Sequence, residues 1–186
     1  MSHPSSPVPP DAPTDRALAF RRLFDAEARF VWNTLRYLGV READLPDVSQ
    51  EAFLTVYRLF DPDNPPRSLR AWLFSILFHA ASNHRRLSRH RRELGSDEIE
   101  AVDEASAPDQ QIAARQELAL VLAALDTLDL DRRAIITMHD LYGHPIPEVA
   151  TALAIPLNTA YSRLRLARQD FLAAVARRRS TRGTHG

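Results

Sequence analysis

Arginine and hydroxyl side chains are concentrated between residues 159 and 168, where the sequence reads TAYSRLRLAR. On a helix through this segment, Ala160 and Leu164 would face inward and the polar side chains outward. Arginine binds phosphate and guanine through paired hydrogen bonds, and hydroxyl groups bind phosphates or base edges. The candidate DNA-contacting residues are therefore Thr159, Tyr161, Ser162, Arg163, Arg165 and Arg168. A helix face that only meets water is the alternative.

A second basic segment, residues 85–92, holds five arginines in eight residues. Cations are favourable at the C-terminal end of a helix, so a solvated helix end is one interpretation. Five arginines exceed what that role requires, and we expect Arg85, Arg86 and Arg89 to contact phosphate.

No residues have the spacing of a catalytic or metal site. Cysteine is absent, which excludes disulfides, thiolate zinc sites and a cysteine nucleophile. The pair His139-Asp140 lacks the additional ligands of a metal-dependent phosphohydrolase. Asp126, Asp129 and Asp131 could suggest a magnesium site, but the aspartate before Arg132, Asp131, is better explained as a helix cap. We expect no catalytic residue, no metal and no cofactor. An enzyme remains a rival hypothesis, which loss of an activity on chelation would support.

The DNA-contacting candidates at 159–168 lie in a predicted helix-turn-helix, residues 146–168. Val149, Ala150 and Leu153 give the first helix a buried face. Pro156 ends the turn, and Asn158 or Thr159 can cap the second helix.

The preceding segments also predict helices and no strands, so the expected fold class is all-α. Apolar steps of three and four residues predict a helix from Arg16 that Gly39 ends, and a second helix with Asp44 as its cap and Pro46 in its first turn. A loop with three prolines precedes a third helix, which Ser68 can cap. Further helices are predicted at 112–125 and 132–141, with two shorter ones after residue 143.

An acidic segment divides the chain into two domains. Residues 16–94 carry 14 arginines against 9 acidic residues, residues 95–115 carry 1 against 6, and residues 116–186 carry 9 against 7. We expect a disordered leader over 1–15, a first domain over 16–94, an acidic flexible linker over 95–115, a second domain over 116–178 and a tail over 179–186. Fully extended, the linker would reach about 75 Å, so the domains can separate widely. No membrane span or signal peptide is evident, and a cytoplasmic location is expected.

The helix-turn-helix resembles the C-terminal DNA-binding region of bacterial RNA polymerase sigma factors. That region follows the pattern E-[IV]-A-x-x-L-x-[IV]-P-x-[GN]-T-V-[KR]-S-R-L-x-R-A-R, and residues 148–168 match it at thirteen positions, from Glu148 through Pro156 and Arg163 to Arg168. In the first domain, residues 47–58 resemble the family's D-L-V-Q-E-V-F-L-R-V-W-R, and residues 70–76 resemble its R-A-W-L-x-x-I. With only these two domains, the chain is similar to the small extracytoplasmic-function (ECF) group.

The resemblance implies two helical bundles, sigma region 2 and sigma region 4, and a transcription initiation factor that binds core RNA polymerase through its β′ and β subunits. It assigns the second helix, with Asp47, Gln50, Glu51 and Leu54, to the coiled coil of β′. The residues themselves support a protein partner, because the polar pair lies beside Phe53, Leu54 and Tyr57, which we expect to be exposed.

The resemblance also implies that the first domain captures an unstacked base of the promoter −10 element, while the second reads the −35 element. Local polar candidates for the −10 contact are Asp63, Asn64, His79 and Asn83, together with Arg85, Arg86 and Arg89. An ordinary exposed histidine is the alternative for His79. The family further implies an anti-sigma factor as a partner.

Several positions depart from the family pattern. Ala154 replaces a turn glycine, so the turn either avoids a left-handed residue or carries a cost near 1 kcal/mol. Tyr161, Leu166 and His79 also differ, so promoter sequence does not follow from the resemblance.

The alternative functions are a helix-turn-helix regulator that does not dock on polymerase and a helical adaptor that acts only through protein contacts.

Overall fold

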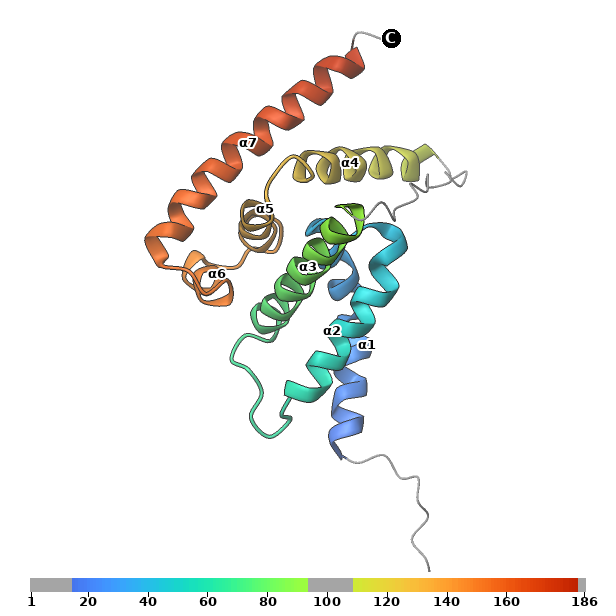
Figure 1. Ribbon diagram of the computed structural model, residues 1–186, viewed down its shortest axis with the longest axis vertical. Coiled ribbons are helices and arrows are strands. Elements are labelled where there is room, and N and C mark those ends of the chain that lie inside the picture. The colour runs from blue at the N-terminus through green and yellow to red at the C-terminus, as the bar shows by residue number, and fades with distance from the viewer. Residues whose placement is uncertain (1–14, 94–108, 184–186) are drawn as a thin grey trace, which may run out of the picture.

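Every secondary-structure element of the described residues is a helix. A computed structural model describes residues 15–93 and 109–183, and no strand occurs in these ranges. The elements are α1 (Asp15–Tyr37), η1 (Glu42–Asp44), α2 (Leu45–Leu59), α3 (Leu69–Glu93), α4 (Asp109–Leu125), α5 (Leu130–Ile136), η2 (Thr137–Leu141), α6 (Ile146–Ala152) and α7 (Leu157–Gly183) (Figure 1). The predicted all-α fold is confirmed. None of the described helices combines the length and apolar character that a membrane span requires.

Helices α1, α2 and α3 form the first bundle around fully buried leucines such as Leu35, Leu73 and Leu77. Helix α1 ends as predicted, because Gly39 adopts a left-handed φ of 89°. The amide of Val40 donates to the carbonyl of Leu35 in this turn, a hydrogen-bond pattern that favours glycine.

The start of α2 differs from its prediction in one respect. Pro46 lies in the first turn as expected, but the side chain of Asp44 makes no cap hydrogen bond. Its carboxylate instead contacts Arg41 at 2.8 Å and His84 at 3.2 Å. Asp44 therefore joins the start of α2 to α3. Its carboxylate contacts these side chains rather than the first amides of α2, because hydrogen bonds between charged groups are the stronger ones.

Helices α4 to α7 form the second bundle, and its ends differ from the predictions. Helix α4 begins at Asp109, inside the segment expected to be linker, because residues 109–115 include several strong helix formers. The predicted helix 132–141 is divided into α5 and the π-helical turn η2. Helix α7 runs to Gly183 and is neither short nor followed by a tail from 179. Residues 157–182 contain no proline or glycine that would end it. The expected leader up to Thr14 and most of the expected linker lie outside the described residues.

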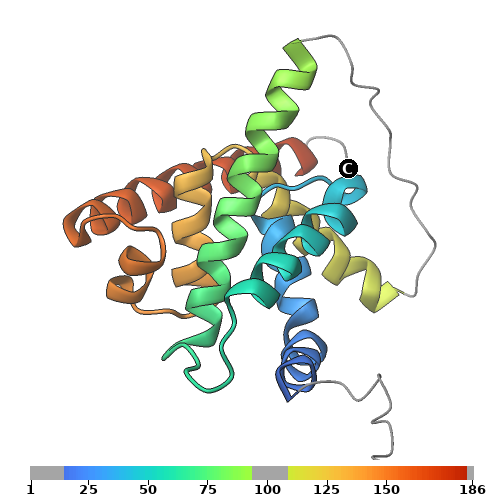
Figure 2. The same ribbon diagram turned by 60° about the horizontal axis from the view of Figure 1, so that its bottom comes forward.

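The two bundles share one continuous apolar core. Helix α3 contacts α6, and α1 contacts α4, so α3 lies alongside both α2 and the second bundle (Figure 2). The ring of Tyr142, just after η2, packs against Phe30 of α1 with centroids 4.9 Å apart. The hydroxyl of Ser68, predicted to cap α3, reaches across to Glu148 of α6 at 3.3 Å. We call this boundary between the two bundles the domain seam.

Candidate nucleic-acid and protein interfaces

One face of α2 carries the four residues assigned to a protein partner. Asp47, Gln50, Glu51 and Leu54 recur at steps of three and four residues, so they lie on one side of the helix. All four are exposed, and 50% of the surface of Leu54 is accessible to solvent. The structure therefore brings these residues together on a solvent-facing surface.

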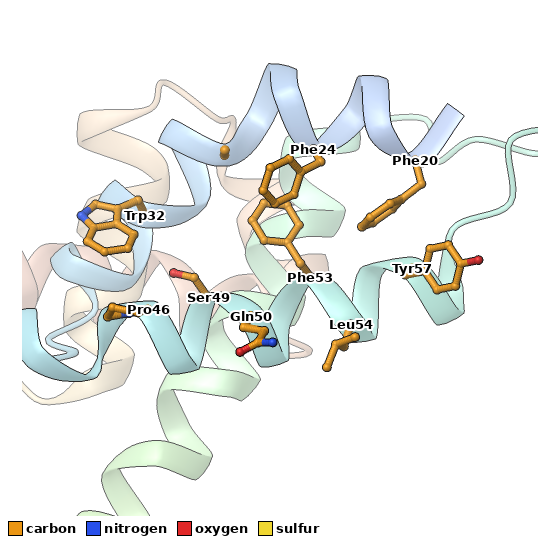
Figure 3. A pocket seen from close by; sticks show the side chains of 10 residues that line it. Phe20, Phe24, Trp32, Pro46, Ser49, Gln50, Phe53, Leu54 and Tyr57 are labelled. Atoms are coloured by element: carbon orange, nitrogen blue, oxygen red, sulfur yellow. The ribbon is translucent and has the colours of Figure 1, made fainter. Parts of the chain in front are cut away.

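An apolar groove of about 420 Å³ runs beside this face, between α1 and α2 (Figure 3). Side chains from both helices line it: Phe20, Phe24, Ala28, Trp32, Pro46, Ser49, Gln50, Phe53, Leu54 and Tyr57. The prediction that Phe53 is exposed is wrong, since only 8% of its surface is accessible. Its ring packs between the two helices and is covered by Phe24, with ring centroids 4.5 Å apart.

The groove, to which α1 contributes Phe20 and Phe24, was not predicted from the sequence. Phe24 is 40% exposed, and Phe20 meets Tyr57 edge to face with centroids 5.0 Å apart. The sequence does contain a signal for it, a second apolar stripe at four-residue steps: Phe20, Phe24, Ala28 and Trp32. With this stripe, the apolar face of the first helix is wider than the core of one bundle can bury.

Ser49 adds a polar group to the apolar wall of the groove. The residue is only 8% exposed, and its hydroxyl has no hydrogen-bond partner among the described residues. A buried hydroxyl is costly unless it finds a partner. The groove therefore presents a buried hydroxyl without a partner, that of Ser49, in a largely apolar wall.

The candidates for the −10 element occupy two places. His79, Asn83 and Arg86 of α3 are exposed, and steps of four and three residues put them on one helix face. Asp63 and Asn64 lie in the loop before α3, where their amides donate to the side chain and the carbonyl of Asp61 at 3.0 and 3.3 Å. No hydrogen bond or ion pair connects these loop residues to His79 or Asn83 within the described parts of the chain.

The basic end of α3 serves two surfaces rather than one. Arg86 shares the outer face with Asn83, whereas Arg85 is half-buried. Arg85 and Arg89 line a cavity at the domain seam. All three predicted residues, Arg85, Arg86 and Arg89, also line a second and wider pocket, beside Asp129 and Asp131 of the second bundle.

Helices α6 and α7 form the predicted helix-turn-helix. Ala154 in the turn adopts a φ of 52°, so the left-handed conformation is kept without glycine. The amides of Ala154 and Ile155 donate to the carbonyls of Thr151 and Ala150 at 3.1 and 3.0 Å, the same pattern that ends α1 at Gly39. The predicted caps are not used, because α7 begins at Leu157, before Asn158 and Thr159.

The N-terminal half of α7 presents its candidate residues to solvent. Tyr161 is 54% exposed, Ser162 and Arg165 are exposed, and Thr159 is half-buried. Ala160 and Leu164 are buried beneath them, as the periodicity predicts. Tyr161, Ser162 and Arg165 are therefore accessible, as contacts with a major groove would require.

Two of the three arginines on this face are held by aspartates of the same bundle. Arg163 pairs with Asp131 of α5 at 2.8 Å. The guanidinium of Arg168 donates to both oxygens of Asp140, at 2.9 Å from Nε, and these hydrogen bonds raise the pKa of Arg168. Arg165 forms no ion pair with any described residue, so it is the arginine with an uncommitted charge.

The aspartates and histidines near α5 have structural roles. Asp129, not the predicted Asp131, caps α5 by accepting a hydrogen bond from the amide of Arg132 at 2.9 Å. Asp131 lies in the first turn of α5, and Nδ1 of His139 lies 2.7 Å from the carbonyl oxygen of His144. Across the described residues, no group of three or more His, Cys, Asp or Glu side chains is placed to hold a metal ion.

The sequence matches two family models in the order expected from its motifs. The model for Sigma-70 region 2 matches residues 23–92, and the model for Sigma-70, region 4 matches residues 118–171. The RNA polymerase sigma factor NccH of Alcaligenes xylosoxydans xylosoxydans is 31% identical over 159 residues, which cover 83% of this chain and 86% of NccH. The ECF RNA polymerase sigma factor SigL of Mycobacterium tuberculosis is 32% identical over 154 residues, which cover 81% of this chain and 85% of SigL.

Solved structures similar to this chain include two sigma factors in complex with partner proteins. The structure of CnrH in complex with the cytosolic domain of CnrY aligns with a TM-score of 0.60 at 30% identity, over 86% of this chain and 88% of that chain. The sigma factor RpoE of Bartonella quintana, in complex with the anti-sigma factor NepR, aligns with a TM-score of 0.64 over 85% of this chain and 97% of that chain. At 20% identity, this second likeness is one of fold.

Two bundles of these types, in this order, define a bacterial transcription initiation factor. The chain belongs to the family of RNA polymerase sigma factors, in its ECF group. Members of this family are transcription factors without enzymatic activity that act with core RNA polymerase at promoter DNA. The alternative of a regulator that does not dock on polymerase is not favoured, because region 2 is present as well as region 4.

Proposed function

We propose that the exposed face of α2 and the groove beside it are the polymerase-docking surface of this sigma factor. Asp47, Gln50, Glu51 and Leu54 would contact the coiled coil of β′. The observation that carries the proposal is an exposed polar face next to an apolar groove of about 420 Å³. Such a groove would bury apolar side chains of a partner helix, and the hydroxyl of Ser49 would gain a hydrogen bond.

Binding to purified core polymerase tests this surface. Leu54→Asp places a charge in the groove wall and should weaken binding at least tenfold, since a buried unpaired charge is strongly unfavourable. Leu172→Asp is the matched control, because Leu172 is 65% exposed on α7 and far along the chain from α2. Equal binding by both variants would place the polymerase contact elsewhere.

We also propose that the two DNA-binding surfaces act on separate promoter elements. The −10 element would be contacted by Asp63, Asn64, His79, Asn83, Arg85, Arg86 and Arg89, since unstacking a base requires a pocket and backbone contacts. The exposed positions of α7, from Thr159 to Arg168, would read the −35 element in the major groove. The first role would belong to the bundle of α1 to α3 and the second to the bundle of α4 to α7, which begins at Asp109 and runs to Gly183.

An anti-sigma factor is the proposed regulatory partner. The related CnrH was solved with the cytosolic domain of CnrY, and RpoE with the anti-sigma factor NepR. The groove between α1 and α2 offers an apolar surface that such a partner would cover. We place the protein in the cytoplasm, where it meets polymerase and DNA, and assign it no catalytic activity and no cofactor.

A further inference from the structure

The domain seam contains a cavity whose walls are rich in arginine. Its volume is about 240 Å³, room for roughly eight waters at about 30 Å³ each. Arg41, Arg85 and Arg89 of the first bundle and Arg133 of the second line it, and the one carboxylate among the lining residues is Asp126. The cavity therefore carries an excess of positive charge.

Two of these guanidinium groups have unmet hydrogen-bonding capacity. Arg133 is only 3% exposed, and although its Nη1 lies 2.9 Å from Asp126, its Nε has no partner among the described residues. Nη1 of Arg85 is likewise buried without a partner. Buried, partnerless N–H groups on a charged side chain are unusual in proteins, and they indicate a missing acceptor.

The charges of the cavity are also poorly compensated. Arg85 and Arg133 lie close enough for the charge of Arg85 to lower the pKa of Arg133, in addition to the larger effect of burial. The negative charge of Asp126 offsets this lowering of the Arg133 pKa only in part, because 66% of the Asp126 side chain is in contact with solvent. Arg41 is engaged with Asp44 at 2.8 Å. Arg85 and Arg89 form no ion pair with any residue in the described ranges.

We propose that this cavity binds a small phosphate-bearing anion that bridges the two bundles. A phosphate group accepts several hydrogen bonds and matches the forked geometry of guanidinium groups. It would accept from the free nitrogens of Arg85 and Arg133 and neutralise their repulsion. Because Arg133 is almost completely enclosed at the seam, the occupant is a free anion of the size of phosphate or pyrophosphate. Since it touches both bundles, bound anion stabilises their packed arrangement.

Calorimetric titration of the full chain with inorganic pyrophosphate, at constant ionic strength, tests the site. The wild type should bind saturably, and Arg85→Gln should weaken binding at least tenfold. Arg86→Gln removes the same charge one residue away on the exposed face of α3 and should change the affinity less than twofold. An absence of saturable binding, or equal weakening by both variants, would overturn the proposal.

Two further measurements separate the remaining explanations. Without added anion, Arg85→Gln should unfold at the same or a higher temperature than the wild type, because it removes a repulsive charge. A clear decrease would show that protein groups already satisfy Arg85 and would contradict the site.

Binding of an unrelated DNA duplex should weaken in Arg86→Gln at least as much as in Arg85→Gln. Selective weakening in Arg85→Gln would assign the cavity to a DNA phosphate and overturn the free anion. None of these measurements involves polymerase, so their outcome is independent of the docking proposal.

Discussion

The hydroxyl groups of Thr34 and Tyr142 lie 2.8 Å apart, although 108 residues separate them along the chain. Thr34 is fully buried in α1, and Tyr142 follows η2 in the second bundle. A polar residue buried at this position is acceptable because it is hydrogen-bonded. This bond and the packing of Phe30 on the same tyrosine ring join the two bundles at the domain seam.

Tyr142→Phe should loosen the seam, because it leaves the Thr34 hydroxyl buried without its partner, at a cost of about 1 to 3 kcal/mol. The chain has no cysteine, so spin labels can be introduced at two exposed positions, Asp25→Cys on α1 and Gln169→Cys on α7. We expect a longer and broader distance distribution for Tyr142→Phe than for the parent. Tyr161→Phe, which alters an exposed tyrosine, is the control and should leave the distribution unchanged. An identical distribution in all three proteins would mean that this hydrogen bond does not hold the seam.

The same tyrosine predicts a dependence of stability on pH. Burial raises the pKa of Tyr142 from 10.0 to about 12. Because the neutral form is favoured in the folded state, the stabilising contribution is fully present below pH 10 and is lost as the pH rises toward 12. The free energy of unfolding should therefore decrease more steeply between pH 10 and 12 in the wild type than in Tyr142→Phe. Parallel pH profiles would contradict a buried, neutral Tyr142.

Ala154→Gly should stabilise the helix-turn-helix by up to about 1 kcal/mol, because a left-handed alanine carries a backbone cost that glycine avoids. Ala152→Gly, at the end of α6, is the control and should destabilise the protein by a similar amount, since glycine disfavours helix. Chemical denaturation measures both. A loss of stability in Ala154→Gly would show that the turn is not strained.

The ion pairs on α7 predict opposite effects of two substitutions on promoter binding. Arg165→Gln removes the uncommitted charge and should weaken binding of the polymerase complex to a promoter fragment by about 1 to 3 kcal/mol if Arg165 reads a base. Asp131→Asn releases Arg163 from its partner and should strengthen binding and steepen its dependence on salt. Fluorescence anisotropy across a salt series measures both effects. Weaker binding by Asp131→Asn would indicate that the ion pair positions Arg163 for its contact.

Apolar periodicity and helix-ending residues predicted the helices well where a helix buries a single apolar face. The apolar stripes that bury Leu35, Leu73 and Leu164 were evident from the sequence, and so was the turn at Gly39. The length of α7 was also predictable, because no proline or glycine interrupts residues 157–182. The prediction of two short helices and of a tail from residue 179 was nevertheless wrong.

Relationships between distant segments could not be predicted in this way. The pairing of Arg163 with Asp131 depends on how α5 crosses α7, and the shared role of Phe24 and Phe53 depends on the separation of α1 from α2. The contact of Tyr142 with Thr34 depends on the packing of one bundle on the other, and a linker that allows wide separation leaves that packing undetermined in the sequence.

Run-off transcription with purified core polymerase on a genomic promoter library tests the central claim most directly. The full chain should direct transcription from a defined set of promoters that share two separated elements, and Leu54→Asp should abolish it while Leu172→Asp retains it. If the wild-type chain selects no promoter and does not bind core polymerase, the assignment of this protein as a sigma factor is contradicted.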